Sequence, residues 1–220
     1  MVGLLELLLH VFDFLEFREL AARIGRAAEA AIDHGQVVVN GRVKRFQFGG
    51  AFNHPPVLAA ISNQTALAGT ILVITNSASD ADVPTQTLTF SLIEAPTGAA
   101  IDPNSGVFTW RPAIAQSPSL QPISVVVSDN GTPVLSATQS FTVTVTQPVH
   151  PTLNAAMITN GQFEFWINGD AGPDYTIQLS TNLVFWSSIA TANSPTLPFT
   201  WNDTNAAKFE TRFYRVLLGP

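Results

Sequence analysis

Cysteine is absent from this 220-residue chain, and charged residues make up only 12% of it. Without cysteine, the chain can form neither disulfide bonds nor thiolate metal sites. The low charge, together with many Thr, Ser, Asn and Val residues, favours β-sheet over solvent-exposed helices. Uninterrupted apolar runs are too short to cross a bilayer, so we expect no transmembrane segment. The apolar start, residues 1–17, contains acidic side chains and no Lys or Arg, which is not the pattern of a signal peptide.

Basic residues are scarce after residue 54. Residues 55–220 contain four Lys or Arg and ten Asp or Glu, whereas residues 1–54 contain six of each class. A surface that binds phosphate groups needs clustered basic side chains. We therefore expect no nucleic-acid partner for residues 55–220.

Groups that could carry out catalysis are missing as well. The chain has four histidines, but no glycine-flanked serine and no pair of acid–base residues accompanies them. Glu6, His10 and Asp13 share one stripe of an expected helix. Such a stripe is typical of a solvated helix face, and its alternative, a metal site, lacks a second set of ligands. We expect the protein not to be an enzyme.

The N-terminal part, residues 1–48, has a helical pattern followed by a hairpin. Apolar residues recur at helical spacing over 4–33, and Gly35 is placed to end the helix. Residues 36–48 then read as strand, Asn-Gly turn and strand, which is a strong hairpin signal.

The rest of the chain reads as two β-modules. A Gly- and Pro-rich linker at 49–56 precedes strand-like runs over 57–147, and a second linker at 148–151 precedes further runs over 152–220. In 141–146, Phe and Val alternate with Thr, which predicts one buried and one exposed face. The sequence thus predicts a mainly β protein, with an antiparallel β-sandwich and a second small all-β domain.

One Pro- and Gly-rich stretch, "PTGAAIDPNSGVFTWRP" at 96–112, predicts a corner of the sandwich. We expect Asp102 to bond its own downstream backbone and Gly106 to adopt a positive φ. In the short strand that follows, Phe108 and Trp110 should lie on the face opposite to Val107 and Thr109. Arg111 is expected to stack on Trp110.

This corner, with "NHPP", "SDAD" and "SDNGTP" around it, resembles the cadherin-like and Ig-like modules of bacterial surface and secreted proteins, related to the dystroglycan-type cadherin-like domain. The resemblance covers about residues 53–147. Residues 152–220, with "YTIQLSTNLVFW" and "RFYRV", resemble a closing module of secreted bacterial proteins. The resemblance implies an Ig/cadherin-like sandwich in an extracellular or cell-surface protein that acts as a spacer, an adhesion unit or a ligand-binding unit.

The same resemblance implies that Asp80, Asp82 and Asp129 occupy the positions at which cadherins bind Ca²⁺, a cation that takes six to eight oxygen ligands. The acidic linker and the first-strand glutamate of cadherins are missing, and Asn53 stands alone upstream. The alternative is that the three carboxylates make loop and turn hydrogen bonds. No cofactor is required, and Ca²⁺ is the candidate cation.

Aromatic residues in the last module have two interpretations. Trp166 and Trp201 have polar neighbours and are the candidate pair for stacking on a glycan. Most other aromatics lie in strand patterns and are expected in the core. The aromatic residues expected in the core are Phe163, Phe165, Phe185, Trp186, Phe213 and Tyr214.

Residues 23–46 are similar to half of an S4-type RNA-binding domain. The matching residues include Asn40 and Gly41, and Arg42, Lys44 and Arg45 would supply the positive charge. The alternative is a helix-plus-hairpin cap without affinity for RNA.

Three functional hypotheses follow. The first is a noncatalytic extracellular Ig/cadherin-like protein whose partners are other extracellular modules, proteins or glycans. The second is a carbohydrate-binding accessory unit of a secreted enzyme. The third is RNA binding through the N-terminal part.

Overall fold

The structure is a computed structural model that describes residues 36–39, 42–45, 53–159 and 162–219. The chain divides into two units, residues 1–52 and residues 53–220. The division falls inside the linker expected at 49–56. The helices expected over 4–33, and the stripe of Glu6, His10 and Asp13, lie outside the described residues.

The expected N-terminal hairpin is present. Strand β1 (Gln36–Val39) pairs antiparallel with β2 (Arg42–Arg45), and Val38 lies opposite Val43. The Asn-Gly turn expected at residues 40–41 lies outside the described residues.

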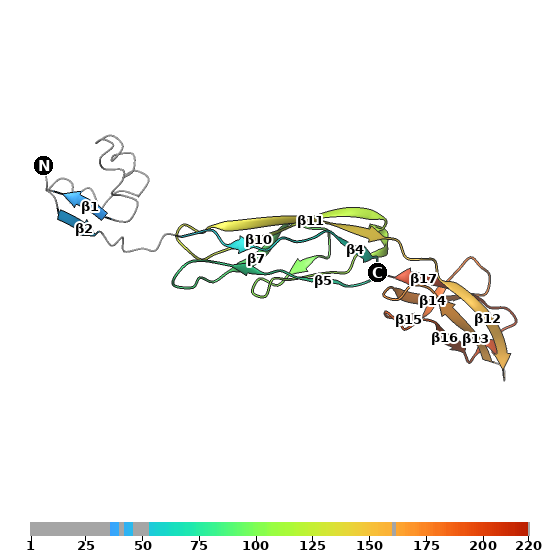
Figure 1. Cartoon of the computed structure of the whole chain (residues 1–220). Coiled ribbons are helices and arrows are strands. Elements are labelled where there is room, and N and C mark those ends of the chain that lie inside the picture. Colours follow the sequence, from blue (N-terminus) through green and yellow to red (C-terminus); the bar gives the residue numbers. More distant parts are fainter. Residues whose placement is uncertain (1–35, 40–41, 46–52, 160–161, 220) are drawn as a thin grey trace. The chain divides into compact units, whose positions relative to one another are not determined.

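Residues 57–146 form a sandwich of short strands. The larger sheet has the order β4-β11-β10-β7, and its strands are labelled in Figure 1. The facing strands form the sheets β5-β9-β8 and β3-β6. The strand bounds are β3 Val57–Leu58, β4 Gln64–Leu67, β5 Leu72–Thr75, β6 Ala78–Ser79, β7 Thr89–Glu94, β8 Ala100–Ile101, β9 Val107–Trp110, β10 Ser119–Ser128 and β11 Ser136–Thr146.

Aromatic and β-branched side chains fill the space between the two layers. Phe108 of β9 meets Phe141 of β11 edge to face, with ring centroids 6.0 Å apart. Along β11, Phe141, Val143 and Val145 are buried and the threonines between them are not, which confirms the predicted alternation. Each fully buried Val or Phe contributes roughly 1.5–3 kcal/mol relative to an exposed position.

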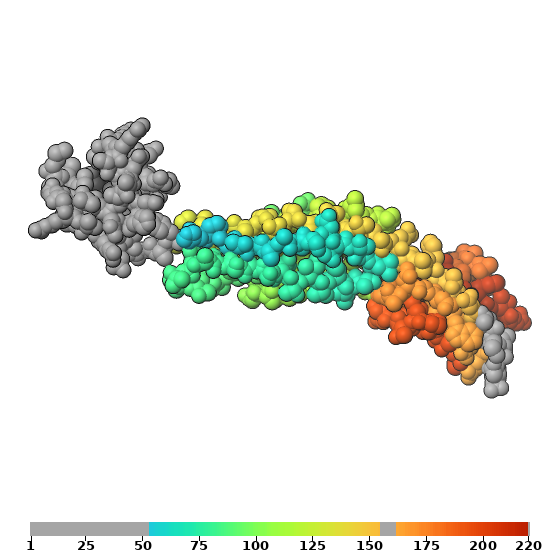
Figure 2. Space-filling model, in the orientation of Figure 1, coloured from blue at the N-terminus to red at the C-terminus, as the bar shows by residue number. Residues whose placement is uncertain are grey.

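The pairing of β4 with β11 departs from the antiparallel pattern. Before it, β3 pairs antiparallel with β6, with Val57 opposite Ser79, and the chain then crosses to the other sheet. There β4 pairs parallel with β11, so that Ala66 lies opposite Val145. In Figure 2 this cyan segment runs beside the yellow segment of β11. The sandwich is confirmed, but the period of the side chains carries no information on strand direction, so the parallel pair was not anticipated.

The corner at 96–112 is built as the sequence predicts. The Asp102 carboxylate accepts hydrogen bonds from the backbone N–H groups of Asn104 at 3.0 Å and Ser105 at 2.7 Å. Gly106 has φ +67°, and Phe108 and Trp110 are buried. The Trp110 indole donates to the carbonyl of Thr97 at 3.2 Å, which closes the corner.

Residues 152–219 form two further three-stranded sheets, β12-β13-β16 and β15-β14-β17. A core of Phe165, Ile167, Tyr175 and Ile177 lies between them. The strand bounds are β12 Thr152–Thr159, β13 Gln162–Asn168, β14 Asp174–Ser180, β15 Ser187–Ala192, β16 Phe199–Asp203 and β17 Phe213–Gly219. The linker expected at 148–151 falls between β11 and β12.

Buried Asp203 at the end of β16 ties the last strand to this core. It accepts a hydrogen bond from the Tyr214 hydroxyl at 2.7 Å and forms an ion pair with Arg212. Burial, and then the hydrogen bond to the Asp203 carboxylate, raise the pKa of Tyr214 to about 12. Because every charge here has a partner, the network fits a structural role.

Candidate functional site

Asp82, in the loop after β6, is buried and has both carboxylate oxygens engaged. Its Oδ1 lies 2.6 Å from Nδ1 of His54, and its Oδ2 accepts from the His54 backbone N–H at 2.9 Å and from Gln86 Nε2 at 2.8 Å. A carboxylate only accepts hydrogen bonds, so His54 Nδ1 carries the proton of this contact. Bonds from the backbone and then the side chain of His54 hold the pKa of Asp82 below its ordinary 3.8, so Asp82 is charged at neutral pH.

Asp129, at the end of β10, is saturated in the same way. Its Oδ1 accepts from the backbone N–H groups of Gly131 at 3.0 Å and Leu135 at 2.9 Å, and its Oδ2 accepts from Asn53 Nδ2 at 3.0 Å. Burial acts to raise the pKa of Asp129, but the bonds from Leu135, Gly131 and Asn53 outweigh it, and the pKa lies below 3.8. Each oxygen therefore holds at least one protein donor.

Two amide side chains connect the carboxylates. Asn53 Nδ2 donates to Asp129 and also to the carbonyl of Pro133 at 2.7 Å, and Gln86 donates both to Asp82 and to Asn53 Oδ1. We call Asn53, His54, Asp82, Gln86 and Asp129 the polar clasp. The sequence pointed to its aspartates, but not to the glutamine that joins them.

The clasp does not fit a calcium ion in this arrangement. Asp80 Oδ1 accepts from the Asp82 backbone N–H at 2.9 Å, and the side-chain oxygens of Asp80 and the clasp that are buried without a partner are Asp80 Oδ2 and Gln86 Oε1. Calcium needs six to eight oxygens, and those of Asp82 and Asp129 already accept hydrogen bonds. Among the described residues, no group of three or more His, Cys, Asp or Glu is placed to hold a metal ion. Calcium binding by Asp80, Asp82 and Asp129 stays a prediction.

The two candidate tryptophans lie on opposite faces of one sheet. Trp201 of β16 lies opposite Phe165 of β13 and packs on it with ring centroids 5.6 Å apart, so it borders the core. Trp166 lies opposite Thr200, and neighbouring residues on a strand point to opposite faces. Trp166 and Trp201 therefore form no common stacking platform, and glycan binding by either alone stays a prediction.

Among the described residues, the most exposed aromatic one was expected in the core. Phe185 is 76% exposed because it lies in a turn, and β15 begins only at Ser187. Asn182 Oδ1 accepts from the backbone N–H groups of Val184 and Phe185 at 3.0 Å each, which turns the chain outward. The core prediction for Phe185 is wrong, and the Ser-Thr-Asn triplet before it was the signal for this turn.

Arg111 does not stack on Trp110. Its Nε donates to the Gly69 carbonyl at 2.6 Å, and its terminal nitrogens form two bonds to the Asp174 carboxylate at 3.1 and 2.8 Å. A further bond reaches the Gly172 carbonyl at 3.0 Å. The guanidinium therefore binds the last module at Asp174, the first residue of β14. The bond from Arg111 lowers the pKa of Asp174 below 3.8.

Two glycines let the backbones approach at this contact. Gly69 has φ +85°, and a Cβ there would lie 2.8 Å from Cα of Pro173. Gly172 has φ +115°, and a Cβ would collide with Thr70. We call Gly69, Thr70, Arg111, Gly172, Pro173, Asp174 and Ser194 the joint.

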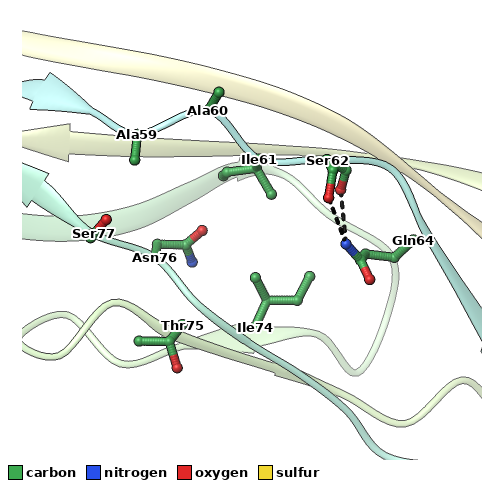
Figure 3. Close-up of a pocket in the computed structure, with 9 residues that line it drawn as sticks. All are labelled: Ala59, Ala60, Ile61, Ser62, Gln64, Ile74, Thr75, Asn76 and Ser77. Carbon is green, nitrogen blue, oxygen red and sulfur yellow. Dashed lines mark hydrogen bonds between the residues drawn. The ribbon is translucent and has the colours of Figure 1, made fainter.

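A small groove opens where the chain crosses between the sheets (Figure 3). It has a volume of about 180 Å³ and no charged residue in its lining. The Asn76 amide points into the space between Ile61 and Ile74. The Gln64 side-chain amide donates hydrogen bonds to the carbonyl and to the hydroxyl of Ser62, at 3.1 Å each.

Asn76 is a buried polar residue of this groove. The residue is 94% buried, and its Nδ2 donates to the Gly106 carbonyl at 2.8 Å. Because a carbonyl only accepts, this bond fixes which end of the amide is oxygen. Oδ1 is buried and has no partner, so Asn76 places an unpaired hydrogen-bond acceptor beside the groove.

The candidate RNA-binding residues Arg42, Lys44 and Arg45 lie on β2. Their side chains, and the helices expected before them, lie outside what the structure describes. RNA binding by these residues stays a prediction.

Comparison with known proteins agrees with the architecture of the middle module. Residues 55–146 match a family model described as "Putative Ig domain". No curated protein matches the chain. No helix among the described residues is long and apolar enough to cross a membrane.

Similar solved structures include three from protocadherins. The extracellular domain of protocadherin gamma B4 is 20% identical, covering 48% of this chain and 19% of that one, with a TM-score of 0.37. Cadherin domains 3–6 of protocadherin gamma B2 are 20% identical, covering 48% and 29%, with a TM-score of 0.36. The third cadherin domain of human protocadherin 7 is 15% identical, covering 45% and 92%, with a TM-score of 0.35. The chain thus spans less than a third of the first two structures.

Proposed function

Residues 55–146 are an Ig/cadherin-like module, a kind of domain typical of extracellular adhesion and spacer proteins, and from this premise we propose that the chain is a noncatalytic extracellular or cell-surface spacer. In this proposal the sandwich and the last module act as one stiff rod segment. Its partners are neighbouring extracellular modules and the proteins or glycans that they meet.

The observation that carries the proposal is the joint. Arg111 uses its guanidinium to bind acceptors from both modules, and the exposed fractions of the Arg111 and Asp174 side chains are 30% and 18%. Planar guanidinium and carboxylate groups fix their relative orientation when they meet through two bonds. Gly69 against Pro173 adds backbone contact without intervening side chains. A spacer needs such a joint, because a free linker would let the modules swing independently.

The absence of cysteine makes stiffness directly measurable. Thr138 on β11 and Thr191 on β15 are exposed, and because the chain has no cysteine, cysteines introduced there would be its only two spin-label sites. We expect electron–electron double resonance to give a single narrow distance distribution. A broad distribution, as from a freely jointed pair, would contradict the spacer proposal. Extracellular placement is tested separately, by protease accessibility of the chain on intact cells of its source.

The groove at Asn76 favours a second candidate, binding of a glycan group. A neutral hydroxyl would donate to Asn76 Oδ1, and the aliphatic lining would take its carbon skeleton. Retention on immobilised polysaccharides, compared between the native chain, Asn76→Ser and Trp166→Ala, tests this candidate. Retention of the native chain that is lost in Asn76→Ser would support the groove, and loss in Trp166→Ala would support stacking on the sheet face. No retention of the native chain would contradict both.

RNA binding through residues 1–48 is the third candidate. Filter binding at two salt concentrations tests it, because contacts with phosphates weaken steeply as salt rises. Binding that is absent, or that does not depend on salt, would contradict it.

A further inference from the structure

We propose that protein donors take the place of a divalent cation at the polar clasp, so that this end of the sandwich closes without calcium. The inference concerns how the module is held where the chain enters it at Asn53 and His54. It does not depend on the spacer proposal, since a ligand-binding module needs the same closure.

Protein donors engage all four oxygens of the Asp82 and Asp129 carboxylates. The Asp82 carboxylate accepts three hydrogen bonds, two from His54 and one from Gln86. The Asp129 carboxylate also accepts three, from Asn53, Gly131 and Leu135. Hydrogen bonds to ionised groups are about twice as strong as those between neutral groups, and several together stabilise a buried carboxylate.

The donors are nitrogen groups that calcium cannot use as ligands. The orientation of the Asn53 amide is fixed independently of the aspartates, because its Nδ2 also donates to the Pro133 carbonyl at 2.7 Å. If the Asn53 amide were turned so that its oxygen took the place of Nδ2, that oxygen would face the Pro133 carbonyl, and both groups only accept hydrogen bonds. Asn53 Oδ1 is itself engaged by Gln86. A cation would therefore have to break several of these bonds before gaining its ligands.

Two oxygens remain open, Asp80 Oδ2 and Gln86 Oε1. Two acceptors are far short of the six to eight oxygens that calcium takes. They match water molecules, which donate hydrogen bonds to buried acceptors in most globular proteins. The clasp is thus complete with protein groups and water.

Close packing confirms that the clasp holds the start of the module. A Cβ on Gly131 would collide with the Asn53 side chain, so the loop after Asp129 is shaped around Asn53. His54 is bound through both its backbone and its ring to Asp82. Residues 53 and 54 are therefore pinned to two loops that lie far away in the sequence.

Hydrogen exchange on the full chain tests the proposal. The amides of His54, Gly131 and Leu135 donate directly to the two carboxylates, so their exchange rates report opening of the clasp. We expect equal rates in millimolar calcium chloride and in EGTA. In Asn53→Ala the Gly131 and Leu135 amides should exchange roughly 10- to 100-fold faster, as expected for loss of a hydrogen bond to a charged group.

Asn104→Ala is the matched control. Asn104 carries the same amide in the exposed corner loop, where its side chain makes no hydrogen bond to another group, and its loss should leave the three rates unchanged. If Asn53→Ala does not fold, Gln86→Ala and the native chain in calcium and EGTA carry the test. Slower exchange of the native amides in calcium, with a melting temperature raised by roughly 5–10 °C, would overturn the proposal and support the calcium site. Equal rates in Asn53→Ala and Asn104→Ala would also overturn it.

Discussion

Arg111→Ala is the substitution that separates a stiff joint from an incidental contact. The change removes the two bonds to the Asp174 carboxylate and those to the carbonyls of Gly69 and Gly172. It leaves the cores of both modules intact, because the side chain lies between them and not within either. The expected result is therefore a loosened joint between two folded modules.

The magnitude follows from partial burial. A fully exposed ion pair contributes 0–1 kcal/mol, and breaking a fully buried one costs about 3–5 kcal/mol. With exposed fractions of 30% and 18% for Arg111 and Asp174, solvent screens the pair in part. We expect a loss of roughly 2 kcal/mol of coupling, which raises the ratio of open to closed joints about 30-fold. Arg111→Lys should recover only part of this loss, because lysine cannot bind the carboxylate through two parallel bonds.

The spin-label distance between positions 138 and 191 measures the change. The distribution should broaden in Arg111→Ala and stay narrow in Arg215→Ala, which removes the same side chain where it lies over Trp186. Far-ultraviolet circular dichroism checks that both variants remain folded. An equally narrow distribution in Arg111→Ala and the native chain would refute the reasoning that Arg111 holds the joint.

Acid should loosen the same joint. The bond from the Arg111 guanidinium holds the pKa of Asp174 in the folded protein below the ordinary 3.8. The stabilisation from this pair is therefore present above pH 3.8 and is lost as the pH falls through the lowered pKa of Asp174. The spin-label distance followed from pH 5 downward checks this, and Asp174→Asn should show no such step. Gly106→Ala, with φ +67° and a Cβ 2.9 Å from Phe90, should cost roughly 2–3 kcal/mol in urea unfolding. Gly98→Ala has φ +89° but no contact closer than 3.9 Å, so it should cost only about 1 kcal/mol. Phe185→Ser should change the free energy of unfolding by less than about 0.5 kcal/mol, whereas a core phenylalanine would cost about 3–5 kcal/mol.

The sequence motifs identified some residues of the polar clasp but not all of them. The resemblance to cadherin-like modules pointed to Asp82 and Asp129, and the structure joins them through Asn53 and Gln86. Gln86 was missed because it belongs to no motif and acts through its position after a loop. The chemistry of a carboxylate depends on what faces it, and spacing along the chain does not report which groups face each other.

Local patterns decided much of the rest. Alternation of Phe or Val with Thr along β11 predicted its buried face, because side chains on a strand point alternately to two sides. The turn chemistry of Asp102 and Gly106 predicted the corner, because both requirements lie within a few residues. The same kind of reasoning gave a wrong prediction for Phe185. This residue precedes β15, which begins at Ser187, so its side chain lies in the solvent and not in the core.

Sequence alone determined that the chain after residue 53 is made of β-strands, which residues its corner needs, and which side of β11 is buried. Only the tertiary structure decided that Arg111 leaves its neighbour Trp110 for Asp174, that β4 runs parallel to β11, and that Asn76 opens into a groove. The physical reason is the range of each interaction. Propensity, alternation and turns act between residues that are close in the chain, whereas ion pairs, strand partners and grooves join segments that only folding brings together.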